Sequence, residues 1–567
     1  MKIHYLHYIL LVLLLGGILM TTACQKETDD ALETAVNETQ DTAETESAVP
    51  ETTLTVSGAD YTDYVPDSLE DWIDENSVNM QNGANTRPGI IVSPYYTLTV
   101  NGTEIPVFTE KTTRSPHSFA YIDVSGYSDD GSFSLDVNMT THIERENPVV
   151  LPESAGVTAT VDGQNVHAEI NAFGTYTFTF DRKDGKGGSA FPLTLMVKPA
   201  ETVNVPDSYK RIEFEPGEYP GADTVLNQQN TLYYFKKGTY YIECISIEAD
   251  NITLYFEPGT LLRASFLTYK DDGSPKYSSL FSSWGHKNVT IIGRPSLDVA
   301  MRGVAGVIFS FTRMENMEFA GFNVCNSNSW TCCFTNCKDI TIRDLILIGY
   351  RTYSDGVMLS DCENANVSGC FVRTGDDALE VKSTSDGTLR TKNVVFENNA
   401  VWTDKGIAYG CVYESNFDQS EVTWRNNSVG FALADWSSHL GCATVSIEGS
   451  NPSITDSDMT FENLEIYVTH CPLITICMEN GGVVRDIHFK NIHAKEATLN
   501  SSVSKNYIDL IIKNSDRGPI SDFTIGDLWF EDISWNDTAL TAENSSEEIR
   551  FSVPKDYPTD EKILHVQ

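Results

Sequence analysis

The chain has 567 residues, of which 41% are hydrophobic, so it is long enough for two or three domains with a large buried core. Its 80 acidic residues outnumber 39 basic ones and give a formal net charge of −41 at pH 7. This excess of negative charge argues against DNA, RNA or an anionic membrane surface as a partner.

The N-terminus has the pattern of an export signal. A basic start precedes the apolar run Ile9–Leu15, and small residues follow it. The segment Thr21–Cys24 resembles a bacterial lipobox, whose cysteine becomes the lipidated first residue of the mature protein. We therefore predict a lipoprotein signal peptide over residues 1–24. The protein is then expected at the extracellular face of a bacterial cell membrane, lipid-anchored through Cys24, with plain secretion as the alternative.

Two segments of different composition follow the signal. Residues 25–80 are rich in Thr, Glu, Asp and Ala and poor in bulky apolar residues, which predicts a disordered acidic linker. Residues 88–200 contain short alternating stretches such as Tyr96–Val100, separated by turn pairs such as Asn101-Gly102. Alternation with frequent turns predicts an antiparallel β-sandwich, in which we find no catalytic constellation.

A repeat runs through residues 205–550 and decides the fold class. Apolar residues stand two apart in each unit, and the second residue of the unit recurs after 23 to 37 residues. Such a period with strand alternation and no helical periodicity predicts an all-β fold, a right-handed parallel β-helix. Residues one period apart then lie in columns, about 4.8 Å per rung. The nine units are Asn288–Ile291, Asn316–Phe319, Asp339–Ile342, Asn364–Val367, Asn393–Phe396, Glu421–Trp424, Asp458–Phe461, Asp486–Phe489 and Asp522–Ile525.

Three aspartates stand about one period apart. Asp355 is followed by Gly356, and the pair Asp376-Asp377 comes 21 and 22 residues after Asp355. We expect the three carboxylates on adjacent rungs and on one face. Clustered carboxylates repel one another, so at least one should keep its proton near neutral pH while another stays ionised. Glycosidic cleavage needs this division, whereas turn capping or calcium binding is the alternative for a single aspartate.

These motifs carry a family resemblance. Ser-Asp-Gly at 354–356 and Thr-Gly-Asp-Asp-Ala at 374–378, with the repeat around them, resemble the polygalacturonase-like clan of glycoside hydrolases. The clan comprises the polygalacturonase family and the dextranase/isopullulanase family, numbered 28 and 49. The resemblance covers about residues 205–540, and the β-sandwich resembles the N-terminal domain of the dextranase side. It implies inverting hydrolysis without a metal or cofactor, with Asp376 as general acid and Asp355 and Asp377 activating water.

Departures from the polygalacturonase pattern bear on the substrate. Residues 404–410 contain no His where polygalacturonases carry Gly-His-Gly, and Thr475–Gly482 stands in place of an Arg-Ile-Lys that binds the substrate carboxylate. A polyuronate would meet Glu479 there without a cationic partner. We therefore predict a neutral polysaccharide substrate, with a dextran-like α-glucan favoured. The alternatives are a polygalacturonase acting on pectin and a non-catalytic carbohydrate-binding surface β-helix.

Four residues near the aspartates are predicted to bind substrate. Lys382 and Lys405 follow the two turns, and Tyr409 and Tyr413 lie one rung beyond the aspartate pair. A solvated lysine or a core tyrosine is the alternative for each. Aromatic side chains can also pack on sugar rings, although a tryptophan is more often part of the hydrophobic core. Candidates of this kind are Trp330, Trp402 and Trp436.

The cysteines predict no metal site. Eleven remain after Cys24, so an oxidised protein would keep at least one free thiol. Cys332, Cys333 and Cys337 are close together, but the sequence has no Cys-x-x-Cys pair that could complete a metal site with them. We expect these small apolar side chains to fill the repetitive core.

Overall fold

The computed structural model describes a defined part of the chain. The predicted signal peptide, Cys24 and most of the predicted linker lie outside the described residues. No helix within the described residues is long and apolar enough to cross a membrane. The described residues are 54–60, 90–110, 112, 115–182, 191–264, 270–271, 276–277, 279–299, 306–327, 329–349, 351, 353–384, 388–434, 441–447, 453–479, 481–500, 506–513, 522–554, 557 and 563–567.

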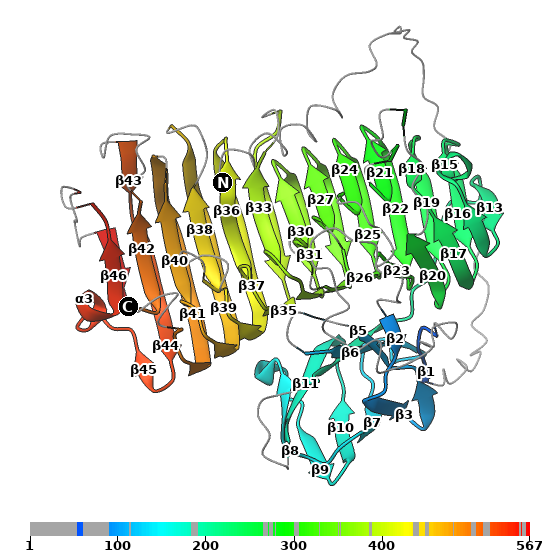
Figure 1. The fold of residues 1–567 in the computed structure, drawn as a ribbon, viewed down its shortest axis with the longest axis horizontal. Helices are drawn as coiled ribbons and strands as arrows, with labels where there is room; N and C mark the ends of the chain where they lie inside the picture. The colour runs from blue at the N-terminus through cyan, green and yellow to red at the C-terminus, as the bar shows by residue number, and fades with distance from the viewer. Residues whose placement is uncertain are drawn as a thin grey trace, which may run out of the picture. The chain divides into compact units, whose positions relative to one another are not determined.

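The N-terminal strands form the predicted β-sandwich, drawn in blue to cyan in Figure 1. One sheet has the order β2-β5-β6-β12-β11-β8 with β1 on β6, and the other has the order β4-β3-β7-β10-β9. Apolar side chains from both sheets form one core, as the strict alternation of buried and exposed residues along β7 illustrates. The strands are β1 (Thr55–Ser57), β2 (Ile90–Val92), β3 (Tyr96–Val100), β4 (Thr103–Ile105), β5 (Phe108–Glu110), β6 (His117–Ser125), β7 (Leu135–Thr141), β8 (Arg145–Leu151), β9 (Ala159–Asp162), β10 (Asn165–Ile170), β11 (Gly174–Arg182) and β12 (Leu193–Pro199), with the 3-10 turn η3 (Glu153–Ala155).

Two features of the sandwich correct the sequence analysis. Thr55–Ser57, assigned to the disordered linker by composition, is a strand that pairs antiparallel with β6, and Val56 is buried in the sandwich core. A three-residue strand is too short to stand out in a polar segment. The sheet that contains β6 and β12 is also mixed, because these two strands run parallel.

The remaining strands form the predicted parallel β-helix, which follows rung after rung from teal to red in Figure 1. Within the described residues, one sheet has 23 strands and a second has 12, and neighbouring rungs pair in parallel register. The last strand, β47, pairs with β44, so the fold continues past the predicted end at residue 550.

The strands of the larger sheet are β13 (Lys210–Phe214), β14 (Gly217–Tyr219), β16 (Thr231–Phe235), β17 (Gly238–Ile242), β19 (Ile252–Phe256), β20 (Thr260–Ala264), β22 (Lys287–Gly293), β23 (Ser296–Asp298), β25 (Glu315–Ala320), β26 (Asn323–Cys325), β28 (Lys338–Arg343), β29 (Ile346–Ile348), β31 (Glu363–Ser368), β32 (Phe371–Arg373), β34 (Lys392–Glu397), β35 (Ala400–Thr403), β37 (Gln419–Ala432), β39 (Thr455–Thr469), β41 (Gly482–Ala497), β43 (Phe523–Ile525), β44 (Leu528–Trp535), β45 (Thr538–Ala539) and β47 (Leu564–Val566). The smaller sheet contains β15 (Val225–Leu226), β18 (Ile245–Ile247), β21 (Phe281–Trp284), β24 (Phe309–Thr312), β27 (Cys332–Thr335), β30 (Val357–Ser360), β33 (Leu379–Ser383), β36 (Tyr409–Ser415), β38 (Ala443–Ile447), β40 (Ile474–Met478), β42 (Ile508–Ile512) and β46 (Ile549–Ser552). Two short helical turns, η4 (Gly221–Thr224) and α3 (Ser545–Glu548), accompany them.

The polar residue that opens each repeat unit has a structural role. In eight of the nine units it has a positive φ of 52° to 57°, a left-handed bend that Asn and Asp tolerate better than most residues. The amide side chains also bond from rung to rung: Asn364 Nδ2 donates to Asp339 Oδ1 at 2.9 Å, and Asn393 Nδ2 donates to Asn364 Oδ1 at 2.9 Å. The repeat therefore encodes both the bend and a ladder of hydrogen bonds.

The interior of the β-helix is filled by stacked apolar side chains. One aromatic column joins Phe396, Trp424 and Phe461, with ring centroids 5.6 and 4.4 Å apart. The eleven cysteines from Cys244 to Cys477 are all buried. A separate apolar cluster joins the sandwich to the helix, with Phe119 on one side and Phe371 on the other.

Candidate active site

Strand register brings the predicted carboxylates together. Val357 of β30 pairs with Leu379 of β33, so Asp355 and Asp377 lie at the same level on adjacent rungs, each two residues before these partners. The Gly356 N–H donates to the Asp377 carbonyl oxygen at 2.8 Å. The expectation of neighbouring carboxylates on one face therefore agrees with the geometry.

Small residues let the turns that carry the predicted catalytic aspartates approach one another. The Ser354 hydroxyl accepts from the Gly375 N–H at 2.9 Å and so ties one turn to the next. A Cβ on Gly356 would lie 2.3 Å from the Ala378 carbonyl oxygen, and one on Gly406 would lie 2.4 Å from the Asp376 carbonyl carbon. Glycine is needed at both positions because backbone of the neighbouring rung occupies the space of a side chain.

The three aspartates are deeply buried. Their exposed fractions are 3% for Asp355, 7% for Asp376 and 3% for Asp377. Asp376 Oδ1 accepts from the Asp377 N–H at 3.1 Å, and Asp377 Oδ1 accepts from the Ile407 N–H at 3.0 Å. Asp355 Oδ2 is buried and has no hydrogen-bond partner among the described residues. An oxygen in this state can accept a hydrogen bond from an incoming group.

Lys382 supplies positive charge to the cluster. Its Nζ lies 3.1 Å from Glu414 Oε2, 3.3 Å from Glu380 Oε2 and 3.9 Å from Asp355 Oδ1. It also lies 5.3 Å from the centroid of the Trp330 ring. Burial acts to lower the pKa of Lys382, but the surrounding carboxylates outweigh it and hold that pKa well above its usual value. Lys382 therefore stays an ammonium and serves as an internal counter-ion.

Glu380 belongs to this cluster and was missed by the sequence reasoning. It is 0% exposed and stands between Leu379 and Val381, which both face the helix core. The two-residue period of a strand then puts Glu380 on the outer face with Lys382, a signal that was available in the sequence. Burial raises the pKa of Glu380 well above its usual value, with Lys382 acting against the rise.

Glu414 was also missed, for a different reason. It reaches Lys382 from β36, where the pairing with β33 is irregular: Val381 pairs with Cys411, but Ser383 pairs with Ser415. Three residues of β36, 412–414, therefore stand opposite the single residue Lys382 of β33. No motif in the sequence marks such an irregularity, so the position of Glu414 could not be inferred from the repeat.

Burial and mutual repulsion raise the pKa values of the aspartates. Burial, followed by the charge of Asp377, raises the pKa of Asp376 to about 7. Burial and then the charges of Asp376 and Glu380 hold the pKa of Asp355 well above its usual range. Burial also raises the pKa of Asp377, while Lys382 acts to lower it. A carboxyl group with a pKa near 7 can exchange a proton at neutral pH.

The same carboxylates form a group of oxygen ligands. One oxygen each of Asp355, Asp377 and Glu380 lies within 4.8 Å of the others. Hard cations such as Ca²⁺ and Mg²⁺ prefer such oxygens. Lys382 already pairs with Asp355 and Glu380, so the protein supplies counter-charge to this group from its own side chains.

The predicted substrate-binding residues have different fates. Tyr409 pairs with Leu379 and faces the core; it is 0% exposed, and its hydroxyl donates to the Ser428 carbonyl oxygen at 2.8 Å. The prediction that Tyr409 binds substrate is therefore wrong, because strand alternation turns it inward. Tyr413 has a φ of +54° and packs, half-buried, against the same core, and Lys405 is half-buried in the turn before Gly406.

The three tryptophans that were candidates for sugar contact also differ in their surroundings. Trp330 is half-buried, and the pairing of Cys332 with Val357 places it level with Asp355. Trp402 is 5% exposed and belongs to the apolar cluster between sandwich and helix, so its proposed contact with sugar is wrong. Trp436 lies outside the described residues.

The substrate argument based on Glu479 is wrong as well. In the smaller sheet, β36 and β38 separate β40 from β33. Glu479 follows the C-terminal end of β40, whereas Asp377 precedes the N-terminal end of β33. Glu479 also forms an ion pair with Lys513. It therefore neither faces the carboxylate cluster nor lacks a cationic partner.

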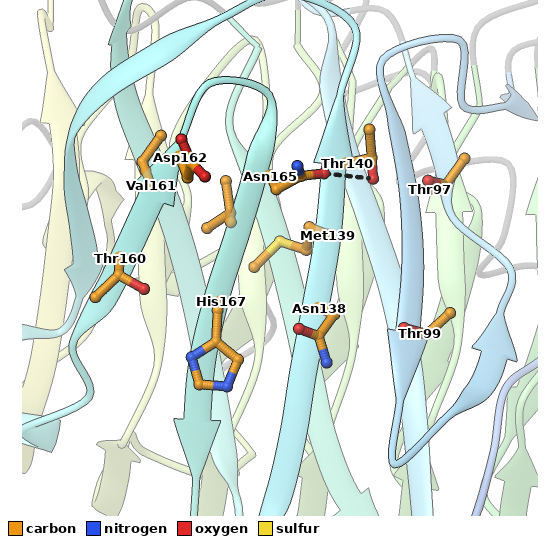
Figure 2. A pocket seen from close by; sticks show the side chains of 11 residues that line it. Thr97, Thr99, Asn138, Met139, Thr140, Thr160, Val161, Asp162, Asn165 and His167 are labelled. Atoms are coloured by element: carbon orange, nitrogen blue, oxygen red, sulfur yellow. Dashed lines mark hydrogen bonds between the residues drawn. The ribbon is translucent and has the colours of Figure 1, made fainter.

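The sandwich has a hollow of its own on the outer face of the five-stranded sheet, shown in Figure 2. It measures about 340 Å³ and is lined by short polar side chains, including Thr97, Asn138 and Thr140. Asp162 is the one carboxylate among its lining residues, and His167 pairs with Asp136 at 2.8 Å. The described residues that line this hollow therefore offer a single carboxylate and no counterpart of the cluster around Lys382.

Comparisons with known proteins bear on the family and the fold of the chain. Residues 304–474 match the model of the family described as glycosyl hydrolases family 28. Two exopolygalacturonases of Arabidopsis thaliana are 25% identical over 179 residues (29% of this chain, 36% of the relative) and 24% identical over 203 residues (33% and 44%). The chain thus spans less than half the length of these curated relatives. Dex49A from Penicillium minioluteum shares the fold, with 13% identity, a TM-score of 0.56 and coverage of 86% of this chain and 96% of that one.

The matched segment contains Asp355, Asp376 and Asp377. Fold and family match together confirm the predicted class for this segment, a glycoside hydrolase on a parallel β-helix. More particularly, residues 304–474 are similar to family 28, so the predicted resemblance to that family is confirmed for this segment. The likeness to Dex49A concerns the fold.

Proposed function

We propose that the protein is an inverting glycoside hydrolase with Asp376 as its general acid. The observation that carries the proposal is the pairing of β30 with β33, which gathers three buried aspartates around Lys382. A proton held by Asp376 passes to the glycosidic oxygen as the bond to the anomeric carbon breaks. Water adds to that carbon and loses its proton to the second carboxylate group, Asp355 or Asp377.

Lys382 supports this division of roles. Its ammonium acts to lower the pKa of all three aspartates, and for Asp377 it is the largest influence after burial, which favours the ionised state that a base requires. Trp330, level with Asp355, is placed to pack against a sugar ring. Lys405 and Tyr413 remain proposed substrate contacts.

We propose a neutral polysaccharide, with a dextran-like α-glucan favoured, as the substrate. Five carboxyl groups share the cluster with Lys382, whose ammonium already has three carboxylate partners. A uronate sugar would bring a further negative charge into this buried acidic site. A neutral sugar does not incur that cost.

A second candidate is polygalacturonate, the backbone of pectin. The two curated relatives carry the name exopolygalacturonase, which favours a uronate substrate for the segment that they match. The acidic character of the cluster argues in the other direction, and the two candidates are distinguished by assay.

The test is reducing-sugar release from dextran, pullulan, arabinan and polygalacturonate, with Asp376→Asn as the paired variant. Release from a neutral glycan that is lost in the variant is the expected result. Release from polygalacturonate alone would establish the second candidate. Undiminished release by Asp376→Asn would refute the assignment of the general acid.

We also propose that the protein is exported and anchored through a lipid on Cys24. The support is the sequence of residues 9–24 alone. Wild-type protein should partition with bacterial membranes and incorporate labelled palmitate, whereas Cys24→Ala should do neither; equal partitioning of the two would contradict the anchor.

A further inference from the structure

Two neighbouring turns carry the catalytic aspartates and their support. Arg373 ends β32, and Asp376 follows three residues later; Asp404 comes just after β35, and Ile407 follows three residues later. The Ile407 N–H holds Asp377, and the Ala378 N–H donates to the Ile407 carbonyl oxygen at 3.0 Å. The two turns are thus joined at the end that holds the carboxylates.

The other end of the turns is joined by a buried ion pair. Arg373 Nε lies 3.3 Å from Asp404 Oδ2, and its Nη2 lies 3.4 Å from Asp404 Oδ1. Both side chains are 1% or less exposed. The guanidinium also lies 5.0 Å from the centroid of the Trp402 ring. Because a two-pronged contact fixes orientation as well as distance, this pair sets how the two turns face each other.

The β-sandwich contacts this ion pair through His117. His117, the first residue of β6, is 0% exposed, and its Nδ1 lies 3.1 Å from Arg373 Nη1. Its ring packs 4.6 Å from Phe371, and its Nε2 lies 2.8 Å from Thr194 Oγ1 on β12. His117 therefore bridges the sandwich and the rung that leads into the catalytic turn.

The chemistry of the partners fixes the tautomer of His117. A guanidinium can only donate, so Nδ1 must accept from Arg373 and the proton must reside on Nε2, which donates to Thr194. Burial, followed by the charge of Arg373, holds the pKa of His117 well below its usual value and keeps the ring neutral. A neutral imidazole in this tautomer is a fixed acceptor for Arg373.

We propose that the β-sandwich positions the active site through His117, which orients Arg373 and Asp404 and thereby the turns that hold Asp376 and Asp377. His117, Arg373 and Asp404 are positioning residues, because they act on the aspartates through the turns that they join. The proposal is tested in two ways. Enzyme kinetics rest on the proposed function, whereas hydrogen exchange of the turn does not depend on it.

Two near-isosteric variants separate the roles of the two ring nitrogens. The side-chain oxygen of His117→Asn can take the place of Nδ1 and accept from Arg373, whereas His117→Gln reaches toward Thr194 and leaves Arg373 without this acceptor. Met196→Ala is the matched control, because Met196 is 0% exposed in the same apolar cluster between sandwich and helix. It perturbs the packing of the two domains without touching the ion pair.

The first arm measures kcat and KM on the substrate that wild-type protein hydrolyses. His117→Gln should lower kcat about tenfold or more with KM within about twofold, because turn geometry rather than substrate binding is disturbed. His117→Asn should keep most of kcat, and Met196→Ala should lower Tm with kcat nearly unchanged.

The second arm is amide hydrogen exchange of residues 374–378 followed by mass spectrometry, which needs no substrate. The Gly375 and Ala378 amides are hydrogen-bonded, so they should be protected in wild-type protein. His117→Gln should speed their exchange about tenfold, and His117→Asn and Met196→Ala should not. Unchanged exchange in His117→Gln, or equal acceleration in Met196→Ala, would overturn the proposal even if no substrate is hydrolysed.

Discussion

Asp376 is a buried carboxyl group whose pKa is raised to about 7 by burial and by the charge of Asp377. If Asp376 is the general acid, activity should fall as pH rises through about 7, because the proton it delivers is lost. On the acidic side of the pH profile, activity should be lost at a pH above the usual pKa of an aspartate, since burial also raises the pKa of Asp355 and Asp377. A pH profile of kcat/KM checks both limbs; full activity at pH 9 would contradict the assignment.

The raised pKa of Asp376 also predicts how the stability of the folded protein depends on pH. A carboxyl whose pKa is higher in the folded state stabilises the protein below its unfolded pKa of about 4, and this contribution is lost as pH rises through about 7. Asp376→Asn cannot ionise, so at pH 8 it should be more stable than wild type by roughly 2–4 kcal/mol while being inactive. The two proteins should converge in stability near pH 4. Urea denaturation at both pH values measures the difference, and a less stable variant at pH 8 would contradict it.

Lys382 is expected to be as important as the aspartates. Replacing it by Met leaves the buried Glu380 and Asp355 and the half-buried Glu414 without their common cation, which should lower activity about 100-fold or more. The acidic limb of the pH profile should also move to higher pH, since Lys382 lowers the pKa of Asp355 and Asp377. Lys382→Arg is the control that keeps the charge. An unmoved acidic limb in an active Lys382→Met protein would show that the charge has no such role.

The positions of individual site residues could be predicted from the sequence only in part. Asp355 and Asp377 could be predicted because their spacing equals one rung, and rung spacing is periodic. Tyr409 could not be placed by spacing alone, because one position along β36 decides between core and outer face. Glu414 depends on an irregular pairing that leaves no mark in the sequence.

At the scale of the element, the opening residue of each repeat unit performs two tasks. Asn364 adopts a φ of +56°, donates to Asp339 and accepts from Asn393. Asn364→Ala loses both bonds and strains the left-handed bend, whereas Asn364→Gly loses the bonds alone. We expect a loss of about 2–3 kcal/mol for Ala and about 1–2 kcal/mol for Gly. Denaturation profiles of the pair test this order, and a Gly variant that is no more stable than the Ala variant would contradict it.

The strands themselves were predictable because the repeat fixes three things at once: apolar residues two apart, a polar bend residue and a regular interval. β1 escaped prediction because Thr55–Ser57 contributes one buried side chain, Val56, to a sheet built from distant residues. An isolated short strand carries no periodic signal of its own.

At the scale of the whole molecule, the sandwich and the helix meet through the apolar cluster that includes Phe119 and Phe371, next to His117 and Arg373. Sequence patterns described each part separately, but they could not give contacts between parts that follow different periodicities. The same limit explains the error about Glu479, whose partner Lys513 comes from the next rung and follows no motif.

The central claim is that these carboxylates hydrolyse a glycosidic bond with inversion, and product stereochemistry tests it most directly. Proton NMR of the reaction in real time, on whichever polysaccharide the wild-type protein cleaves, reports the anomer that is released first. Wild-type protein should first release the anomer opposite to that of the substrate bond, and Asp376→Asn should release neither anomer. Initial release of the anomer with retained configuration would contradict it.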